Sequence, residues 1–230
     1  MNILITRPLI DSEDLMGKLF SLGHKIIHIP TLRILSIPTE PVDINQFDAF
    51  IFTSANAVRN LKVVSEKKYI ACFCVGSITE KIARQSGYLN TISAGGTVNA
   101  LKNLIINSNE INEKSKIAYF CGDNVAYDLD LELKKEGLKI NKIINYKSEK
   151  ITDLNDQNKD IIVSHPPDMI FVYSLRSGES FIEIIRNHSL YQLMTESKVM
   201  CISGKVANLF KSQGWKKIEV FNPGEELLKL

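Results

Sequence analysis

The chain has 230 residues, of which 44% are hydrophobic and 23% charged, and its 28 basic and 26 acidic residues leave a formal net charge of +2. These values are typical of soluble proteins and lack the basic excess of most nucleic-acid-binding proteins. No apolar run approaches the roughly 20 residues that span a bilayer, and the first residues lack the order of a signal peptide. We therefore expect a cytoplasmic protein with reduced thiols that binds neither nucleic acid nor membrane.

Short apolar runs recur along the chain, at residues 3–5, 25–29, 49–52, 71–75, 91–93, 116–120, 140–146, 169–173, 199–202 and 218–221. They are almost continuously hydrophobic, which indicates strands that are buried on both faces of a parallel sheet. Helical patterns that end at a glycine lie between many of them, at 11–23, 79–87, 125–137 and 205–214. The alternation of strand, helix, glycine and strand predicts an α/β fold with parallel sheets.

The ten predicted strands divide into two sets of five, because residues 49–92 and 169–220 show the same order of strands and helices. We therefore expect two similar lobes, each a mostly parallel five-stranded sheet flanked by helices. A single ten-stranded sheet is the alternative. The polar stretches 36–46 and 148–167 are interpreted as connections, and the second as a mobile one.

The cysteines give no sign of a metal site or of a disulfide framework. All four lie in short apolar runs and are interpreted as core residues: Cys72, Cys74, Cys121 and Cys201. A zinc site needs paired cysteines or histidines at ligand spacing. The chain also lacks a G-x-G-x-x-G after a strand, a P-loop and a G-x-S-x-G elbow. We therefore expect neither a metal nor a cofactor.

Small and polar residues follow the predicted strands, at the edge where open α/β sheets bind ligands. The candidate substrate-binding residues are Arg7, Thr53, Ser54, Ala55, Asn56, Gly76, Ser77, Thr79, Gly122, Ser174, Arg176, Ser203 and Lys205. Such residues are also common helix caps, so each one taken alone can be explained by a structural role at a helix N-terminus. Together they precede several helix N-termini, where free N–H groups favour anions. With their three cations, they predict a site for a small molecule that carries several carboxylates.

Tyr146 ends the predicted strand 140–146, just before a polar stretch. An aromatic residue at a strand end more often packs than reacts. Its phenol can donate a proton to a substrate only if it faces the site. Tyr146 is therefore a candidate catalytic residue whose orientation decides its role.

The order of several segments resembles the uroporphyrinogen-III synthase family. These segments are residues 3–8, 50–58, 75–79, 143–146 and 171–174. The resemblance implies two α/β lobes joined by a two-stranded connection, with the active-site cleft between them. It places the first lobe at 1–34 plus 149–230 and the inserted lobe at 38–145. Periodicity alone does not distinguish this division from a simple split near residue 110.

The resemblance also implies an activity in tetrapyrrole (haem) biosynthesis. The family closes hydroxymethylbilane, a linear tetrapyrrole polycarboxylate, into uroporphyrinogen III with loss of water and inversion of ring D, and uses no cofactor. Tyr146 matches the family tyrosine proposed to assist departure of the hydroxyl group. Thr53 and Thr79 match hydroxyl residues that line the cleft, and Ser174 matches the serine of a strand end in the other lobe. Lys205 lies where some members carry threonines, so its role stays open.

We expect a monomer, because the fold needs no partner to complete its core. Two other functions remain as alternatives. A two-lobed tetrapyrrole- or anion-binding homologue without catalysis is suggested by the few acid and base residues at the strand ends. A nucleotide-using α/β transferase is the weaker alternative, and a thermal shift with a nucleotide would support it.

Overall fold

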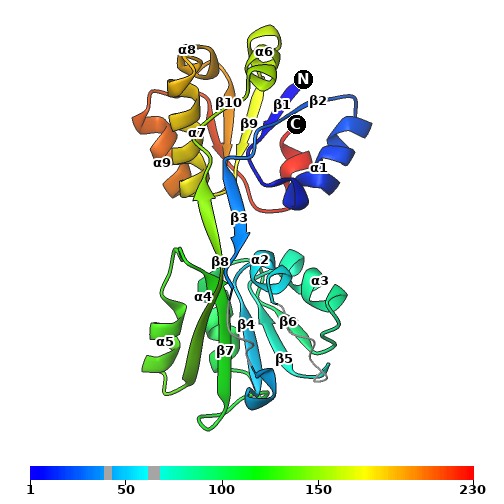
Figure 1. Ribbon diagram of the computed structural model, residues 1–230, viewed down its shortest axis with the longest axis vertical. Coiled ribbons are helices and arrows are strands. Elements are labelled where there is room, and N and C mark those ends of the chain that lie inside the picture. Colours follow the sequence, from blue (N-terminus) through cyan, green and yellow to red (C-terminus); the bar gives the residue numbers. More distant parts are fainter. Residues whose placement is uncertain (39–42, 62–67) are drawn as a thin grey trace. The chain divides into compact units, whose positions relative to one another are not determined.

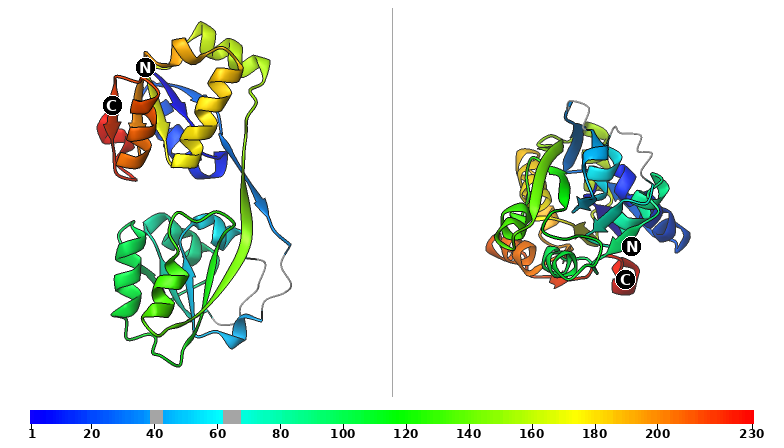
Figure 2. Two further views of the ribbon diagram at one scale, coloured as in Figure 1. Left: turned by 90° about the vertical axis from the view of Figure 1, so that its left-hand side faces the viewer. Right: turned by 90° about the horizontal axis from the view of Figure 1, so that it is seen from below.

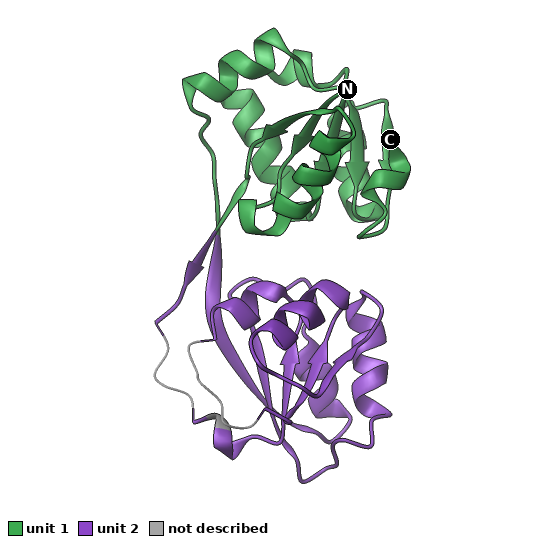
Figure 3. Cartoon of the chain, turned by 90° about the vertical axis from the view of Figure 1, so that its right-hand side faces the viewer, with its two compact units in different colours: residues 1–33, 149–230 green, residues 34–148 purple. Residues whose placement is uncertain are grey.

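The computed structural model describes residues 1–38, 43–61 and 68–230, and its chain forms two compact units (Figure 3). Unit 1 consists of residues 1–33 and 149–230, and unit 2 consists of residues 34–148. Unit 1 is therefore discontinuous in sequence, and unit 2 is inserted between its two parts. Each unit contains one sheet with helices on both faces (Figures 1 and 2).

Unit 1 is built on a five-stranded sheet with the order β11-β10-β9-β1-β2, in which every neighbouring pair is parallel. Its strands are β1 (Asn2–Ile5), β2 (Lys25–His28), β9 (Met169–Val172), β10 (Lys198–Cys201) and β11 (Ile218–Val220). Its helices are α1 (Leu9–Ser21), α6 (Asp156–Ser164), α7 (Leu175–Asn187), α8 (Tyr191–Met194), α9 (Gly204–Ser212) and the short η2 (Glu226–Lys229).

Both faces of this sheet are covered, which explains its continuously apolar strands. Ile3 and Ile5 pack with Leu19 of α1 on one face. Leu4 packs on the opposite face with residues of α7 and α9, among them Phe181 and Phe210. Successive residues of β1 thus enter two different clusters, so an apolar residue is required at each position.

Unit 2 is built on a six-stranded sheet with the order β3-β8-β7-β4-β5-β6. Its strands are β3 (Leu32–Ser36), β4 (Ala49–Phe52), β5 (Ala71–Cys74), β6 (Thr91–Ser93), β7 (Lys116–Gly122) and β8 (Lys139–Lys150). Its helices are the short η1 (Ile44–Gln46), α2 (Ala55–Arg59), α3 (Ser77–Gln85), α4 (Val98–Ile106) and α5 (Leu129–Lys135). Residues of α2 and α3 pack on one face and residues of α4 and α5 on the other.

The chain passes between the units along two segments that are bonded to each other. The Ile37 amide donates to the Asn145 carbonyl at 3.1 Å, and the Ile151 amide donates to the Thr31 carbonyl at 2.9 Å. The numbers rise in one segment as they fall in the other, so β3 and β8 are antiparallel. The Ser180 hydroxyl of α7 lies 2.7 Å from the Thr31 carbonyl and 2.6 Å from that of Ile151. Within unit 1, α7 therefore holds both segments.

The prediction of an α/β fold with mostly parallel strands is confirmed, but two details are wrong. The described part of unit 2 has six strands rather than five, because residues 32–36 form β3. This strand is only partly buried, so it lacks the apolar run that marked the others. The stretch 148–167 is not a simple connection, because it contains the end of β8 and helix α6, whose Ile162 is fully buried. In the other polar stretch, residues 39–42 lie outside the described residues.

Candidate active site

In unit 2, the carboxyl ends of neighbouring parallel strands bring most of the candidate residues to one edge of the sheet. Residues 53–56 follow β4, residues 76–79 follow β5, and Gly122 ends β7. Strand β4 pairs with both β5 and β7 in parallel. The three groups are therefore neighbours, as ligand-binding edges of α/β sheets require.

Several of these residues have a structural role that the structure makes explicit. Ser54 caps α2, and its hydroxyl accepts from the Asn56 amide at 3.1 Å. Asn56 in turn accepts from Arg59 through its side-chain oxygen at 3.1 Å. Gly76 precedes α3, and a Cβ there would lie 3.3 Å from the Cα of Gly96. Gly76 thus permits the close approach of a neighbouring loop.

The remaining candidate residues of unit 2 differ in how much of their surface is exposed to solvent. Ala55 and Thr79 are buried, with 8% and 5% of their surface exposed, whereas Ser77 is exposed. Ala55 and Thr79 therefore offer a ligand little beyond their backbone groups. Ser77 begins α3 and is accessible from solvent.

Thr53 and Tyr119 form a hydroxyl pair at the end of β4. The Thr53 Oγ1 lies 3.2 Å from the Oη of Tyr119, a residue of β7 that is only 1% exposed. Burial raises the pKa of the Tyr119 phenol well above its usual range. The phenol therefore stays protonated and can donate to Thr53. Tyr119 was not among the predicted site residues, because inside an apolar run it is indistinguishable from a core aromatic.

Tyr146 lies against Gly122, the last residue of β7, whereas β8 continues beyond Tyr146 to Lys150 and so does not end where the sequence predicted. A Cβ on Gly122 would lie 2.8 Å from the Cε2 and Cζ of the Tyr146 ring and 3.0 Å from its Oη. The ring also packs against the apolar cluster on the face covered by α2 and α3. Gly122, predicted as a substrate-binding residue, thus provides the space that the Tyr146 ring occupies.

In unit 1, the carboxyl ends of β1, β9 and β10 bring the other candidates to one edge. Arg7 follows β1, residues 174–176 follow β9, and residues 203–205 follow β10. These three strands are neighbours and run parallel. Ser174 caps α7, and its hydroxyl accepts from the Ser177 amide at 3.0 Å. Ser203 precedes α9 without a side-chain cap, and Lys205 is exposed.

Arg7 is held by an aromatic ring. Its guanidinium carbon lies 4.6 Å from the centre of the Tyr173 ring, a geometry that stabilises a cation. Burial, followed by the nearby Glu226 carboxylate, raises the pKa of the Tyr173 phenol. Tyr173 and Glu226 were not predicted. The sequence did contain a signal for Tyr173. It lies two residues after Phe171, so in an extended strand the two side chains point to the same face of the sheet.

Beneath this edge lies a buried hydroxyl cluster that sequence reasoning also missed. The Thr6 Oγ1 donates to the Phe171 carbonyl at 2.8 Å and accepts from the Ser177 Oγ at 3.1 Å. The Thr31 Oγ1 lies 2.6 Å from the same Ser177 Oγ. Since these groups bond to one another, the cluster fixes the ends of β1 and β9 and the start of α7.

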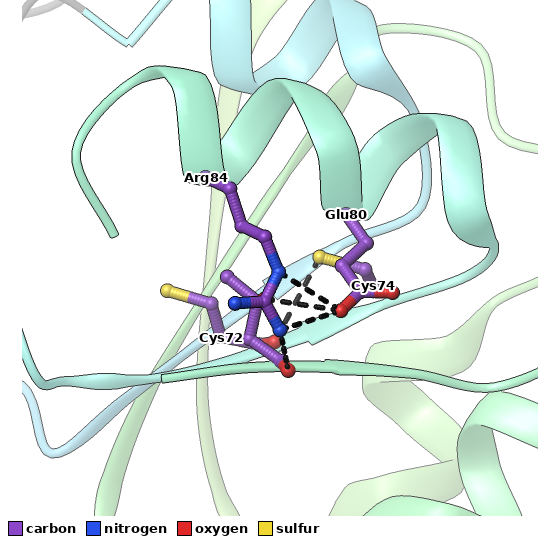
Figure 4. A network of polar contacts seen from close by, with 5 residues as sticks. Cys72, Cys74, Glu80 and Arg84 are labelled. Atoms are coloured by element: carbon purple, nitrogen blue, oxygen red, sulfur yellow. Dashed lines mark hydrogen bonds and ion pairs between the residues drawn. The ribbon is translucent and has the colours of Figure 1, made fainter. Parts of the chain in front are cut away.

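The cysteines of β5 lie beneath α3, beside an ion pair that Figure 4 shows. The Arg84 guanidinium lies 2.9 Å from the Glu80 carboxylate, at i,i+4 spacing on α3. Burial, with a smaller contribution from Glu80, raises the pKa of Cys74 to about 12. Burial also raises the pKa of Cys72. Both thiols are therefore protonated. Within residues 1–38, 43–61 and 68–230, no group of three or more His, Cys, Asp or Glu side chains is arranged to hold a metal ion.

A family model described as "Uroporphyrinogen-III synthase HemD" matches residues 13–223. The chain belongs to the uroporphyrinogen-III synthase family. The resemblance of the ordered segments is thereby confirmed, and with it an enzyme of tetrapyrrole biosynthesis that forms uroporphyrinogen III from hydroxymethylbilane. The family match therefore excludes the alternative function of a nucleotide-using transferase.

Two solved structures share this fold. The uroporphyrinogen-III synthetase of Helicobacter pylori is 15% identical, with a TM-score of 0.64 over 98% of this chain and 94% of that one. A mutant uroporphyrinogen III synthase of the extremely thermophilic bacterium Thermus thermophilus is 15% identical, with a TM-score of 0.58 over 99% of this chain and 94% of that one. A search of curated protein sequences finds no match. In the described part of the chain, none of the helices is long and apolar enough to cross a membrane.

Proposed function

We propose that Tyr146 is the catalytic residue of this synthase and that it assists departure of the substrate's hydroxyl group. The observation that carries this proposal is the place of its ring. Tyr146 lies against Gly122 at the carboxyl end of the sheet, beside the strand that leads to Thr53. This is the edge at which α/β sheets bind their ligands.

The chemistry needs a proton donor because hydroxide is a poor leaving group. The phenol of Tyr146 gives its proton to the hydroxyl group as the carbon–oxygen bond breaks, and water leaves. The substrate loses one proton when the new ring has closed, and this proton restores the phenol or passes to solvent. One water is released overall, and Tyr146 returns to its starting form. General acid catalysis of this kind typically contributes about 10²–10⁴-fold in rate.

Each unit offers groups that suit carboxylates at its own strand ends. In unit 1, Arg7 and Arg176 supply positive charge, and the N-termini of α7 and α9 supply free N–H groups. In unit 2, Thr53, Ser77 and the N-terminus of α3 play the same part. A polyanionic substrate therefore needs no strongly basic protein, since backbone dipoles supply much of the positive potential.

The main task of the enzyme is to select one product. Unassisted closure of the bilane gives the other isomer, in which ring D is not inverted. The protein must therefore hold the chain so that the substituted carbon is attacked, which is catalysis by positioning. Many weak carboxylate contacts spread over the substrate serve this purpose better than one strong contact.

The proposal for Tyr146 is tested with the Tyr146→Phe variant and enzymatically prepared hydroxymethylbilane. We expect kcat to fall by about 10²-fold or more, with KM nearly unchanged. The control is Tyr69→Phe, because Tyr69 is 77% exposed in the same unit. An unchanged kcat for Tyr146→Phe refutes the catalytic role. Formation of isomer I alone, at the rate of a blank, by the unmodified protein would instead favour the non-catalytic homologue.

We further propose that the enzyme acts as a cytoplasmic monomer. In each unit, clusters of buried residues cover both faces of the sheet, so neither sheet needs a partner to complete its core. Light scattering coupled to size exclusion tests the monomer against the 25.9 kDa mass of the chain. Cell fractionation tests the compartment.

A further inference from the structure

Strand β8 contains one extra residue just before Tyr146. Along the parallel pair of β7 and β8, Cys121 is opposite Ile144, but the next residue, Gly122, is opposite Tyr146. Asn145 therefore has no partner on β7 and forms a β-bulge. Bulges bend a strand and re-aim the side chains that follow them.

The bulge decides which face of the sheet Tyr146 occupies. Lys142 lies 3.3 Å from Asp130 of α5, so it faces the side covered by α4 and α5, whereas Ile143 packs on the side covered by α2 and α3. In a regular strand, the side chains of residues 144 and 146 would lie on the same face of the sheet as Lys142. Tyr146 instead packs on the same side as Ile143. Without the extra residue, its ring would not lie against Gly122.

The side chain of Asn145 fixes the bulge to α2. Its Nδ2 donates to the carbonyl of Ala57 at 2.7 Å, and only 2% of its surface is exposed. Its backbone carbonyl accepts from the Ile37 amide at 3.1 Å. Asn145 is thus bonded both to the helix that follows Thr53 and to the segment beside β3.

The buried amide of Asn145 also carries a cost. Its Oδ1 is buried and has no hydrogen-bond partner among the described residues. An unsatisfied buried polar atom disfavours folding, and it calls for a physical reason. An apolar side chain would avoid the cost but would lose the bond to Ala57. The hydrogen bond from Asn145 to α2 is therefore the physical reason for an asparagine at this position.

We propose that Asn145 is a positioning residue for Tyr146. This inference rests on the catalytic role proposed for Tyr146 above. By tying the bulge to α2, Asn145 holds the tyrosine ring against Gly122 and keeps it at a fixed place relative to Thr53. Asn145 acts only through Tyr146, so its removal affects turnover and leaves substrate binding largely unchanged.

The test is a double-mutant cycle with the Asn145→Ala and Tyr146→Phe variants of the full chain. The measured quantities are kcat and KM with hydroxymethylbilane, the fraction of isomer III, and the midpoint of thermal unfolding. We expect Asn145→Ala to lower kcat by about 10-fold or more, since misplacement by 1 Å costs up to about 10²-fold. KM should change by less than about 2-fold. In the Tyr146→Phe background, the same substitution should lower kcat no further.

A matched control is Asn107→Ala, in the same unit. Asn107 follows α4, and its Nδ2 donates to the Asn103 carbonyl at 2.7 Å, the same length as the bond of Asn145. We expect this variant to retain its kcat. A second variant, Asn145→Ser, keeps a donor at the position and should restore part of the lost turnover. If Asn145→Ala does not fold, the cycle is run with Asn145→Ser.

The outcomes separate the two proposals. A loss of kcat in the Tyr146 protein that disappears in the Tyr146→Phe background supports the inference. An equal loss in both backgrounds, or no loss in either, overturns it while the role of Tyr146 stands. An unchanged kcat in Tyr146→Phe alone overturns the catalytic role and the inference together.

Discussion

Replacement of Gly122 by alanine inserts one methyl group beneath the Tyr146 ring. The new Cβ would lie 2.8 Å from two ring carbons of Tyr146. The ring must therefore move by about 0.6 Å or more before it reaches the closest ordinary van der Waals separation. Gly122 does not have a left-handed backbone, so alanine itself fits the conformation there.

The effect on activity should be larger than the effect on stability. A displacement approaching 1 Å at a catalytic group can lower turnover by about 10²-fold, so we expect kcat to fall by about 10- to 100-fold. Overpacking of this size typically lowers the free energy of unfolding by about 1–3 kcal/mol. Reduced chain entropy in the unfolded state returns about 0.4–1 kcal/mol of that loss. The variant should therefore remain folded at the assay temperature.

The assay measures kcat and the fraction of isomer III with hydroxymethylbilane, together with thermal unfolding. The control is Gly17→Ala in α1, because a Cβ there meets no heavy atom within 4 Å. We expect this control to keep its kcat and to gain about 0.5–1 kcal/mol of stability. If Gly122→Ala turns over as fast as the unmodified enzyme, the ring position is not critical and the argument for Tyr146 fails.

Three further predictions concern other buried groups. Tyr119→Phe removes the hydroxyl that is bonded to Thr53. We expect kcat/KM to fall by less than about 10-fold in steady-state kinetics, and the free energy of unfolding to fall by about 0.5–1.5 kcal/mol in denaturant unfolding. Ser180→Ala removes the one hydroxyl that lies between the Thr31 and Ile151 carbonyls. The Thr31 carbonyl keeps the Ile151 amide as a donor, but the Ile151 carbonyl loses the hydroxyl, so the variant should lose about 1–3 kcal/mol in the same unfolding assay. Burial raises the pKa of Cys121 to about 11 and of Cys201 to about 12. These thiols should resist iodoacetamide at pH 8 until the chain unfolds. Because unfolded thiols ionise first, near pH 8.5, stability should fall as the pH rises from about 9 to 11.

The strands were predictable from sequence because most of them are buried on both faces. A run such as 49–52 is apolar at every position, and each of its four residues is fully buried in the structure. Strand β3 follows a different rule. It lies at the edge of its sheet and is only partly buried, so its pairing depends on β8 rather than on its own composition. Helix α6 was missed because Ile162 is its one fully buried residue in an otherwise polar stretch.

The positions of the candidate site residues were predictable only where side chains follow strand ends in a fixed order. Arg7, Thr53 and Ser174 occupy such places, and the structure brings them to the expected edges of the two sheets. Asn145 could not be found in this way. A bulge is defined by the partner strand, since the extra residue exists only relative to β7. The sequence of β8 alone gives no register, and an asparagine in a strand looks unfavourable rather than functional.

The discontinuous unit 1 also sets an order for synthesis. Strand β1 pairs Ile3 with Ile26 on one side and with Met169 on the other, and a two-stranded pair alone is marginal in water. On the ribosome, unit 2 is contiguous and can fold as soon as it emerges, while residues 3–5 wait with their apolar side chains uncovered. Strand β1 is thus enclosed in its sheet only after β9, which is made much later, has emerged. Chains truncated before residue 169 should fold unit 2 and expose β1, which makes early termination a source of aggregation rather than of a smaller working enzyme.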